Sequence, residues 1–487
     1  SLSATDSAPS PTLSDINLHA SGTVTQTAPI TGAGLGLHGT GAFTLTNSGN
    51  SVTTLAGGDS ATKLGSVSFV NAGALEVGSV DPTGITATGD VLIATFTGNL
   101  TVSESIATES TSSSAIVVAA GTSASAGGDG APASGNVLIS DTPTLTVGAG
   151  GTTSLYTGDV AGSTGLTDLV GSGTGRFRYN TSIDSSGTVT AGYTTALATD
   201  VVNALYRQQP SASGSLDSQT ITYGDNTPTF SLSGGTDTQN GDTATVLVQS
   251  PSNSTSGNLI VGTYSVAENS LASLGYDVGS ITNGQLIVNA KALDIASLAV
   301  DSREYDGTRV AALTGTPILT EGGSASTDGK YLTGDVVSLE GSASGEFDTA
   351  NVGTGKAVSL SGLSLAGDDK GNYALNTLVT GDITPRTLTL SATKTYDGTS
   401  VLEAGEVELG NLVGTETLTY SGATASSDQV VTANKYVSAI TLADGSNGGM
   451  ASNYQAPDLS QQSTSNSAAI TPRTLTLSAT KTYDGTS

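Results

Sequence analysis

The chain has 487 residues, with 42 Asp and Glu against 15 Lys and Arg, 64 Gly, one Met, and neither Cys nor Trp. The net charge of -27 argues against nucleic acid and anionic membrane surfaces as partners, because both attract clustered Lys and Arg. The lack of Cys excludes disulfides, zinc–thiolate sites and thiol nucleophiles. Large side chains are scarce, which favours a thin β-structure filled by Val, Leu, Ile and Ala over one thick core.

The first region, residues 1–180, repeats a short apolar cluster roughly every 24 residues. The clusters are Phe43–Leu45, Val67–Phe69, Val91–Ile93, Ile116–Val118 and Val137–Ile139. Coils of this length carry strands too short to stand alone, which favours a right-handed parallel β-helix in which each coil covers the edge of its neighbour. A meandering β-sandwich is the alternative.

The periodicity stops in residues 181–218. The stretch from Gln208 to Gly214 contains Gln, Pro, Ser, Ala and Gly, a composition typical of a connecting segment. We therefore predict a linker or cap between the shaft and the region that follows.

The second half of the chain is a tandem array. Ile383–Ser400 and Ile470–Ser487 are identical, and diverged copies precede them at intervals of roughly 80 to 90 residues. A tripeptide marks each copy: Tyr223-Gly224-Asp225, Tyr305-Asp306-Gly307, Tyr396-Asp397-Gly398 and Tyr483-Asp484-Gly485. We predict modules at residues 219–292, 293–383 and 384–470, and the truncated start of another at 471–487.

Polarity within each copy alternates with the period of a β-strand, as in Thr387–Leu390 and Thr417–Tyr420. Asp397-Gly398 supplies the backbone freedom that a tight hairpin turn needs. About seven short strands in about 90 residues fit a small Ig-like β-sandwich. The predicted fold class is therefore all-β: a right-handed parallel β-helix followed by tandem Ig-like β-sandwich repeats, elongated overall.

The repeated motifs resemble those of the YDG repeat, a family named for the tripeptide. The resemblance rests on Lys394–Gly398 for its opening, Asp348–Lys356 for its middle segment, Gly371–Leu375 for its closing Asn-Tyr strand, and Ile383–Arg386 for the joining stretch. Residues 219–292 are more similar to the related MBG repeats of bacterial surface proteins. The copy at 384–470 departs from the pattern, since Asn434-Lys435-Tyr436 replaces Asn-Val-Gly-Thr-Gly-Lys.

Residues 1–180 resemble the end of the β-helical shaft of filamentous-haemagglutinin-like adhesins, on the strength of Phe43–Asn47 and of Arg176–Asn180 near its exit. A shaft followed by MBG and YDG repeats is similar to large adhesins exported by two-partner secretion. The resemblance implies a secreted, extracellular protein of the bacterial cell surface or biofilm matrix. It also implies an outer-membrane secretion partner for the full-length protein, and no chemistry.

Candidate residues for chemistry are few. His19 and His38 lie in different segments without an acidic motif beside them, which favours isolated surface histidines. No nucleophile elbow, phosphate loop or His-Glu-x-x-His motif occurs, so we predict that the chain is not an enzyme and has no cofactor, catalytic residue or metal site. The acidic turn Gly367–Asn372 is typical of a solvated turn, and Ca²⁺ there is an alternative with the wrong spacing for a twelve-residue calcium loop.

The tripeptides have a structural interpretation: a buried tyrosine followed by a tight turn is a hairpin device that each module needs independently. Two functional hypotheses remain. The first is an extended stalk for cell-surface or biofilm-matrix attachment, with exopolysaccharide or neighbouring adhesin molecules as partners. The second is a polysaccharide-binding module with a defined glycan groove on the β-helix or the repeats. Nothing predicts membrane insertion, because no apolar run approaches the roughly 18 residues that span a bilayer.

Overall fold

The computed structural model describes residues 14–127, 135–234, 238–323 and 326–483. About 45% of the chain is strand and 3% is helix, which confirms the all-β prediction. The chain divides into two compact units. The first consists of Ser1–Ile221, Thr227–Pro251 and Gly262–Ile287, and the second of Thr222–Asn226, Ser252–Val261 and Val288–Ser487.

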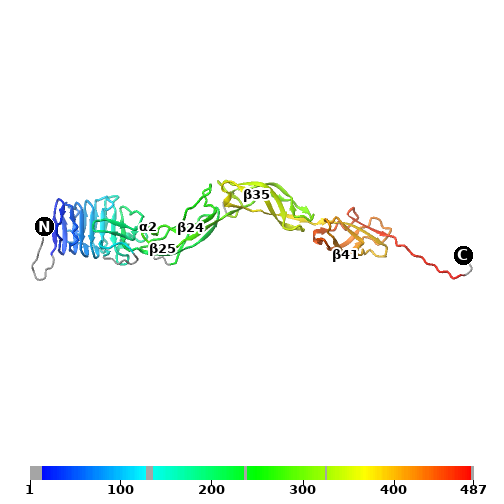
Figure 1. The fold of residues 1–487 in the computed structure, drawn as a ribbon, viewed down its shortest axis with the longest axis horizontal. Coiled ribbons are helices and arrows are strands. Elements are labelled where there is room, and N and C mark those ends of the chain that lie inside the picture. Colours follow the sequence, from blue (N-terminus) through cyan, green and yellow to red (C-terminus); the bar gives the residue numbers. More distant parts are fainter. Residues whose placement is uncertain (1–13, 128–134, 235–237, 324–325, 484–487) are drawn as a thin grey trace. The chain divides into compact units, whose positions relative to one another are not determined.

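The first unit begins with a stack of coils, residues 14–206, whose strands pair in parallel with those of the next coil (blue to cyan in Figure 1). One sheet has the order β16-β19-β15-β12-β9-β6-β4-β2. Its strands are β2 (Val24–Thr25), β4 (Phe43–Leu45), β6 (Val67–Asn71), β9 (Val91–Thr95), β12 (Ile116–Ala119), β15 (Thr153–Thr157), β16 (Phe177–Arg178) and β19 (Val202–Tyr206).

The other sheet of the coil stack has the order β13-β10-β7-β5-β8-β11-β14, and β3 joins β1 to β5. Its strands are β1 (Ile16–His19), β3 (Gly34–His38), β5 (Thr54–Gly57), β7 (Leu75–Val77), β8 (Ile85–Ala87), β10 (Leu100–Val102), β11 (Ile106–Thr108), β13 (Val137–Ile139) and β14 (Leu145–Thr146). From β6 to β14, each coil therefore gives one strand to the first sheet and two to the second.

The register agrees with the sequence spacing for four of the five predicted clusters. Phe43, Val67, Val91 and Ile116 stand in one parallel ladder. The fifth cluster is β13, which pairs with β10 in the other sheet. The spacing could not separate the two sheets, because strands of both carry the same apolar–x–apolar pattern.

The segment 181–218, for which the sequence predicts a linker or cap, contains strands. Its strand β19 is buried and pairs in parallel with β15, so the coil stack continues through it. A hairpin of β17 (Thr181–Ile183) and β18 (Val189–Ala191) precedes β19, and β20 (Ser211–Leu216) follows it. Strand β20 consists mostly of small side chains, so its sequence gives no apolar signal. Its backbone pairs with β25 (Asp277–Thr282) and β22 (Leu232–Ser233).

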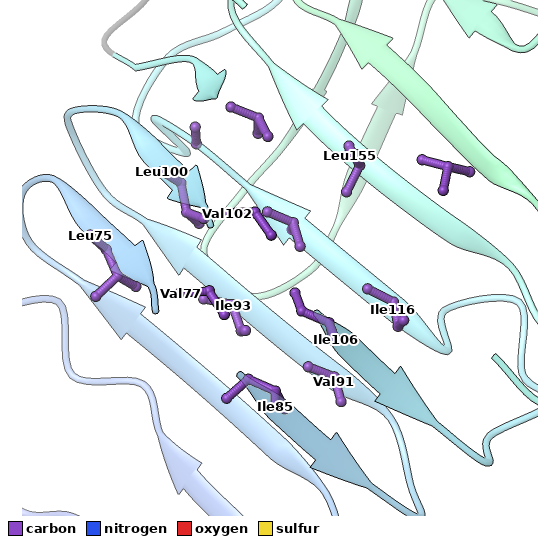
Figure 2. Close-up of a cluster of buried hydrophobic side chains, with 14 of the residues drawn as sticks. Leu75, Val77, Ile85, Val91, Ile93, Leu100, Val102, Ile106, Ile116 and Leu155 are labelled. Carbon is purple, nitrogen blue, oxygen red and sulfur yellow. The ribbon is translucent and has the colours of Figure 1, made fainter. Parts of the chain in front are cut away.

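Aliphatic side chains fill the coil stack as a continuous column (Figure 2). Leu75, Leu100 and Val137 occupy one ladder, and Ile93 and Leu155 lie on the opposite sheet. Each coil thus covers the apolar face of the next. Burial of apolar surface stabilises the fold by roughly 25 cal/mol for each Å² removed from water.

Buried amides satisfy the backbone at the corners of the coils. Asn71 Oδ1 accepts a hydrogen bond from Val52 N at 3.0 Å, and its Nδ2 donates to the carbonyls of Val52, Gly73 and Ala74. Such bonds are needed because a buried backbone group without a partner is costly.

The other elements before Lys291 are α1 (Leu166–Val170), β21 (Gln219–Thr222), β23 (Val246–Val248), β24 (Gly262–Glu268), α2 (Leu271–Leu274) and β26 (Gly284–Asn289). One sheet has the order β21-β26-β24-β23, and another the order β22-β20-β25.

The second unit contains two successive modules. The first includes β27 (Lys291–Leu293), β28 (Ala296–Val300), β29 (Arg303–Glu304), β30 (Val310–Ala311), β31 (Leu313–Ile318), β32 (Glu321–Gly323), β33 (Tyr331–Leu332), β34 (Ser338–Phe347), β35 (Gly353–Ala366), η1 (Lys370–Asn372), β36 (Tyr373–Leu375) and β37 (Leu378–Thr384). The second includes β38 (Arg386–Thr387), β39 (Thr389–Thr395), β40 (Val407–Gly410), β41 (Leu418–Ala425), β42 (Val437–Asp444), η2 (Ala451–Asn453), β43 (Tyr454–Gln455) and β44 (Asn466–Thr471).

The two modules share a strand plan. Each opens with a short strand in parallel register with its Asn-Tyr strand, Lys291 opposite Tyr373 and Arg386 opposite Tyr454. Each also has a long antiparallel hairpin, β34–β35 or β41–β42. Their apolar clusters are small, since eight buried residues form the one that includes Phe347, against 33 in the cluster that fills the coil stack and extends to Ala212, Leu271 and Tyr276.

Candidate functional site

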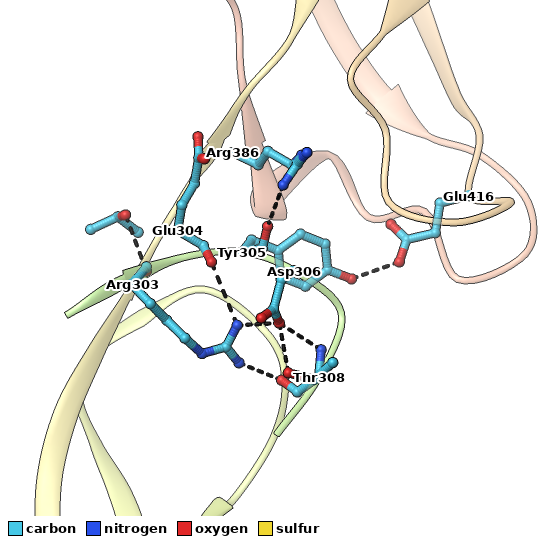
Figure 3. Close-up of polar contacts among 8 residues, drawn as sticks. Arg303, Glu304, Tyr305, Asp306, Thr308, Arg386 and Glu416 are labelled. Carbon is cyan, nitrogen blue, oxygen red and sulfur yellow. Dashed lines mark hydrogen bonds and ion pairs between the residues drawn. The ribbon is translucent and has the colours of Figure 1, made fainter. Parts of the chain in front are cut away.

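The aspartate of the tripeptide at residues 305–307 fixes a tight turn (Figure 3). Asp306 Oδ1 accepts hydrogen bonds from the backbone nitrogen and the hydroxyl of Thr308, each at 2.8 Å. Its carboxylate also pairs with Arg303. Gly307 has a φ of 76°, which is why a glycine follows.

The tripeptide at residues 396–398 repeats this turn. Asp397 Oδ1 accepts hydrogen bonds from Thr399 N at 2.9 Å and Thr399 Oγ1 at 3.0 Å. Lys394, three residues before the aspartate like Arg303, pairs with it at 3.0 Å. The hydrogen bonds from Lys394 and Thr399 lower the pKa of the Asp397 carboxyl. The aspartate therefore serves its own turn, as the sequence predicts.

The tyrosine of the tripeptide has a different role, because Tyr305 reaches the next module. Its hydroxyl donates to Glu416 Oε1 at 2.7 Å, and the Tyr454 hydroxyl donates to Glu416 Oε2 at 2.6 Å. The two rings meet edge to face, with centroids 5.5 Å apart. We call such an arrangement, two tyrosines on one carboxylate, a tyrosine clasp.

A second tyrosine clasp has the same geometry. Tyr223 and Tyr373 both donate to Asp335 Oδ2, each at 2.6 Å, and their rings are edge to face at 5.2 Å. Tyr223 belongs to residues 222–226 of the second unit, whereas Asp335 and Tyr373 belong to the module that begins at Lys291. Both clasps thus use a tripeptide tyrosine, an acid and the tyrosine of an Asn-Tyr pair.

A third clasp lies in the first unit, where Tyr179 directly follows β16 of the coil stack. Asp242 Oδ2 accepts from the hydroxyls of Tyr179 at 2.7 Å and Tyr276 at 2.9 Å. The Tyr179 ring also stacks on Tyr206 of β19 at 5.5 Å. The same chemistry therefore closes the coil stack against the residues that follow it.

The acids of the second-unit clasps stand at the end of similar turns. Asp335 N donates to Leu332 O at 3.2 Å, and Glu416 N donates to Val413 O at 3.0 Å. The backbone nitrogen of the first residue of each turn donates to the hydroxyl of the tyrosine in the Asn-Tyr pair. Leu332 N donates to the Tyr373 hydroxyl, and Val413 N donates to the Tyr454 hydroxyl. The hydroxyl of that tyrosine is therefore both donor and acceptor.

Glycine allows these turns to approach the tripeptides closely. A Cβ on Gly307 would lie 2.8 Å from Val413 Cγ1, and a Cβ on Gly224 would lie 3.0 Å from Leu332 Cδ1. Both glycines have positive φ, at 76° and 92°. Gly224 and Gly307 are thus required both for their turns and for the contact with the next module.

The asparagines of the Asn-Tyr pairs bind the backbone of the preceding segment. Asn453 Oδ1 accepts from Val352 N at 3.0 Å, and Asn372 Oδ1 accepts from Val261 N at 3.0 Å. Val352 lies in the segment Asp348–Lys356 that carries the family resemblance, so that segment also contributes to a junction.

The acidic turn Gly367–Asn372 is solvated only in part: Asp368, Lys370 and Gly371 are exposed, whereas Asp369 and Asn372 are buried. Asp369 is only 5% exposed and accepts from Val336 N at 2.8 Å, Thr255 N at 3.2 Å and the Thr255 hydroxyl. These bonds join residues 252–261 to the following module. The prediction was wrong for Asp369, because charge alone does not reveal a buried acceptor with three donors.

Apolar packing accompanies the clasp of Tyr305. One cluster combines Phe347, Val358 and Ile383 of one module with Leu388 and Leu418 of the next. Arg386 adds a hydrogen bond to the Tyr305 carbonyl at 3.5 Å (Figure 3). It also donates to Asn411 O at 2.8 Å. The cluster has no break at the boundary between the modules.

Burial keeps the clasp tyrosines protonated. Burial and the bonded carboxylate raise the pKa of Tyr223, Tyr305 and Tyr454 to about 12. Burial likewise raises the pKa of Tyr373, Tyr179 and Tyr276 above the ordinary value. Burial also raises the pKa of Asp242, although hydrogen bonds from Tyr179 and Tyr276 act in the opposite direction. At neutral pH the tyrosines are therefore neutral donors.

The four predicted tripeptides are in different surroundings. Tyr223 and Tyr305 are 0% and 3% exposed, whereas Tyr396 and Tyr483 are 37% and 93% exposed. Asp225 accepts from Thr222 N at 2.9 Å, while Asp484 and Gly485 lie outside the described residues. The prediction that each module needs its tyrosine independently does not hold for Tyr223 and Tyr305, because both bind the acid of the next module.

The two histidines are not isolated, which corrects the sequence prediction. Parallel pairing of β1 and β3 places His19 beside His38, and the rings stack with centroids 4.2 Å apart. A repeated Leu-His pair, Leu18-His19 and Leu37-His38, was the overlooked signal. Among the residues described, no group of three or more His, Cys, Asp or Glu could hold a metal ion. No helix in that part of the chain is long and apolar enough to cross a membrane.

Sequence reasoning missed the acids Asp242, Asp335 and Glu416. The available signal was an apolar residue followed three positions later by an acid, as in Leu332–Asp335 and Val413–Glu416. Such a pattern is short, and it gains meaning only when the turn is seen beside the tyrosines.

Comparison with known families identifies a YDG domain at residues 289–381. This match confirms the presence of a YDG domain and covers the module with β27 to β37 up to Gly381. No curated protein and no solved structure matches the chain.

Proposed function

We propose that this chain is part of an extracellular filamentous adhesin of the two-partner-secretion type. In this proposal a right-handed parallel β-helix shaft and tandem Ig-like modules of MBG and YDG type form an extended structural stalk. The stalk gives attachment at a bacterial cell surface or in a biofilm matrix. The observation that supports it best is the repeated tyrosine clasp, which joins one module to the next with the same three groups.

The distribution of buried groups favours a load-bearing role over a ligand site. The apolar cluster of Phe347 extends into the next module through Leu388 and Leu418, so neighbouring modules stabilise one another. The tripeptide and Asn-Tyr residues of the second-unit clasps serve junctions. A surface ligand site would instead leave its polar groups available to the ligand.

The partners in this proposal are exopolysaccharide or neighbouring adhesin molecules, and an outer-membrane secretion partner for the full-length protein. The net charge of -27 would keep exported molecules soluble and mutually repelled. The proposal assigns no catalytic step and no cofactor to the chain.

A module exchange in the producing bacterium tests the stalk directly. One strain carries an in-frame deletion of residues 293–383, and a second carries another copy of residues 384–470 in their place. We expect the deletion to reduce attachment to a surface and the replacement to restore it, because a stalk needs length and junctions rather than a particular surface. Antibody labelling of intact cells checks that both variants are displayed equally.

Two results would contradict the stalk. Attachment that the replacement fails to restore would locate a specific site in residues 293–383. Saturable, stoichiometric binding of a soluble exopolysaccharide to the purified chain, measured by calorimetry, would support a glycan groove instead.

A further inference from the structure

The turn at Tyr396 repeats the backbone setting of the clasp tyrosine Tyr305. Tyr305 N donates to Thr384 O and Tyr396 N donates to Thr471 O, both at 2.9 Å. The parallel register is also the same, with Arg303 opposite Ile383 and Lys394 opposite Ile470. Tyr396 therefore stands at the equivalent position of its own module.

The residues that follow Ile470 repeat those that begin the next module at the Tyr305 junction. Arg473, Thr474 and Leu475 have the same sequence context as Arg386, Thr387 and Leu388. Leu388 is 0% exposed at its junction, whereas Leu475 is 78% exposed. The segment that begins the next module at the Tyr305 junction is thus repeated in the sequence after Ile470.

None of the described residues occupies the opposite side of that junction. A Cβ on Gly398 would meet nothing within 4 Å, whereas one on Gly307 would meet Val413. Tyr396 is 37% exposed against 3% for Tyr305. Among the residues described, no hydrogen bond joins the Tyr396 hydroxyl to a carboxylate such as Glu416.

We propose that the face around Tyr396, Gly398 and Leu475 is the docking surface for one further YDG-type module. The occupant begins with Arg473-Thr474-Leu475 and supplies an acid in a turn like Val413–Glu416, together with a tyrosine like Tyr454. Docking buries the Tyr396 ring against that tyrosine and gives its hydroxyl a carboxylate acceptor. This inference does not depend on attachment, so it can fail or hold separately from the proposed function.

One contact of the Tyr305 junction is not expected at this face. The Val352 loop that binds Asn453 has no counterpart beside Tyr396, because Asn434 is followed directly by Lys435. The tyrosine, glycine and leucine contacts therefore have to carry the docking, and the acid is its most specific element.

The test adds one further module to the full chain. Since Ile470–Ser487 is identical to Ile383–Ser400, a copy of residues 401–470 placed after Ser487 completes a second module of the 384–470 type. Both the original and the extended chain carry Tyr483→Phe, so that the peptides containing residues 396 and 483 differ in mass. Nitration by tetranitromethane is then followed for Tyr396 by mass spectrometry, with Tyr305 as the internal reference.

We expect Tyr396 to react at least about tenfold more slowly in the extended chain, the factor that corresponds to 1.4 kcal/mol of docking free energy. Replacing the added counterpart of Glu416 by Ala should restore much of the reactivity while Tyr305 stays protected. An unchanged nitration rate of Tyr396 would overturn the proposal. An added module that stays unfolded by circular dichroism would overturn it as well, because the same sequence folds when it follows Tyr305.

Discussion

The coil stack and the paired modules of the second unit are stabilised in different ways. In the coil stack, each coil adds aliphatic side chains to one column, and parallel pairing covers the strand edges of its neighbours. In the second unit the apolar clusters are small, and the polar clasps stand where one module meets the next. A chain with few large side chains can therefore grow in length either by repeating a core or by repeating a junction.

This difference matters for how each region responds to a mutation. Loss of a core side chain in the coil stack removes contacts with the coils before and after it. Loss of a clasp residue removes a specific polar contact between modules and leaves each module's own strands paired. The predictions below separate these two responses.

The largest effect is expected for Phe69→Ala in β6, because Phe69 is 0% exposed within the column. Removing a buried phenylalanine side chain costs about 3–5 kcal/mol of unfolding free energy. Phe96→Ala is the matched control, since Phe96 is 39% exposed and should cost less than about 1 kcal/mol. Urea denaturation followed by circular dichroism measures both, and equal losses would contradict a column built on Phe69.

A smaller effect is expected for Glu416→Ala, which leaves the hydroxyls of Tyr305 and Tyr454 without their carboxylate. An unsatisfied buried polar group costs about 1–3 kcal/mol. Hydrogen exchange should quicken at the Tyr305 junction and stay unchanged in the coil stack. The control is Glu408→Ala on the exposed side of β40, for which a change under about 0.5 kcal/mol is expected.

Alkaline pH should loosen the clasps before it affects the coil stack. Tyr305 and Tyr454 have their pKa raised from 10.0 to about 12, so folding favours their protonated forms. Their contribution to stability is complete below pH 10 and is lost as the pH rises through about 12. Tyrosinate absorbance, recorded together with hydrogen exchange, tests this prediction. In the Tyr305→Phe, Tyr454→Phe double variant, the loss of exchange protection at this junction near pH 12 should disappear.

The smallest effect is expected for Lys63→Ala, which removes the exposed ion pair with Glu109 in the coil stack. The nitrogen and oxygen are 2.7 Å apart, but both side chains are accessible to water. Such pairs contribute roughly 0–1 kcal/mol. A loss of more than 1 kcal/mol in urea denaturation would mean that surface charge, and not the aliphatic column, stabilises the coils.

Much of the fold could be predicted from the sequence because its periods are visible. The clusters at Phe43, Val67, Val91 and Ile116 gave the parallel ladder directly, since one apolar strand per coil recurs at nearly constant spacing. The placement of Val137–Ile139 failed because both sheets use the same pattern. Strand β19 was missed because the coil between β15 and β19 is longer than the others.

The candidate site was predicted only in part. The tripeptides and the Asn-Tyr pairs were found, because they recur in sequence, but the partners of the tyrosines were not. Asp335 and Glu416 each lie 38 residues before the tyrosine of their Asn-Tyr pair. That spacing alone does not place them beside Tyr223 and Tyr305, which are more than 110 residues away in the sequence. Asp369 was taken for a solvated residue, because acidic side chains near glycine usually face water.

A double-mutant cycle between Tyr305 and Glu416 tests the central claim most directly. Unfolding free energies are measured by native-state hydrogen exchange for the parent chain, Tyr305→Phe, Glu416→Ala and the double variant. A clasp across the module boundary predicts a coupling energy of about 0.5–3 kcal/mol, because each single change removes the same hydrogen bond. Strict additivity of the two changes would contradict the account, since the tyrosine and the acid would then not join the modules.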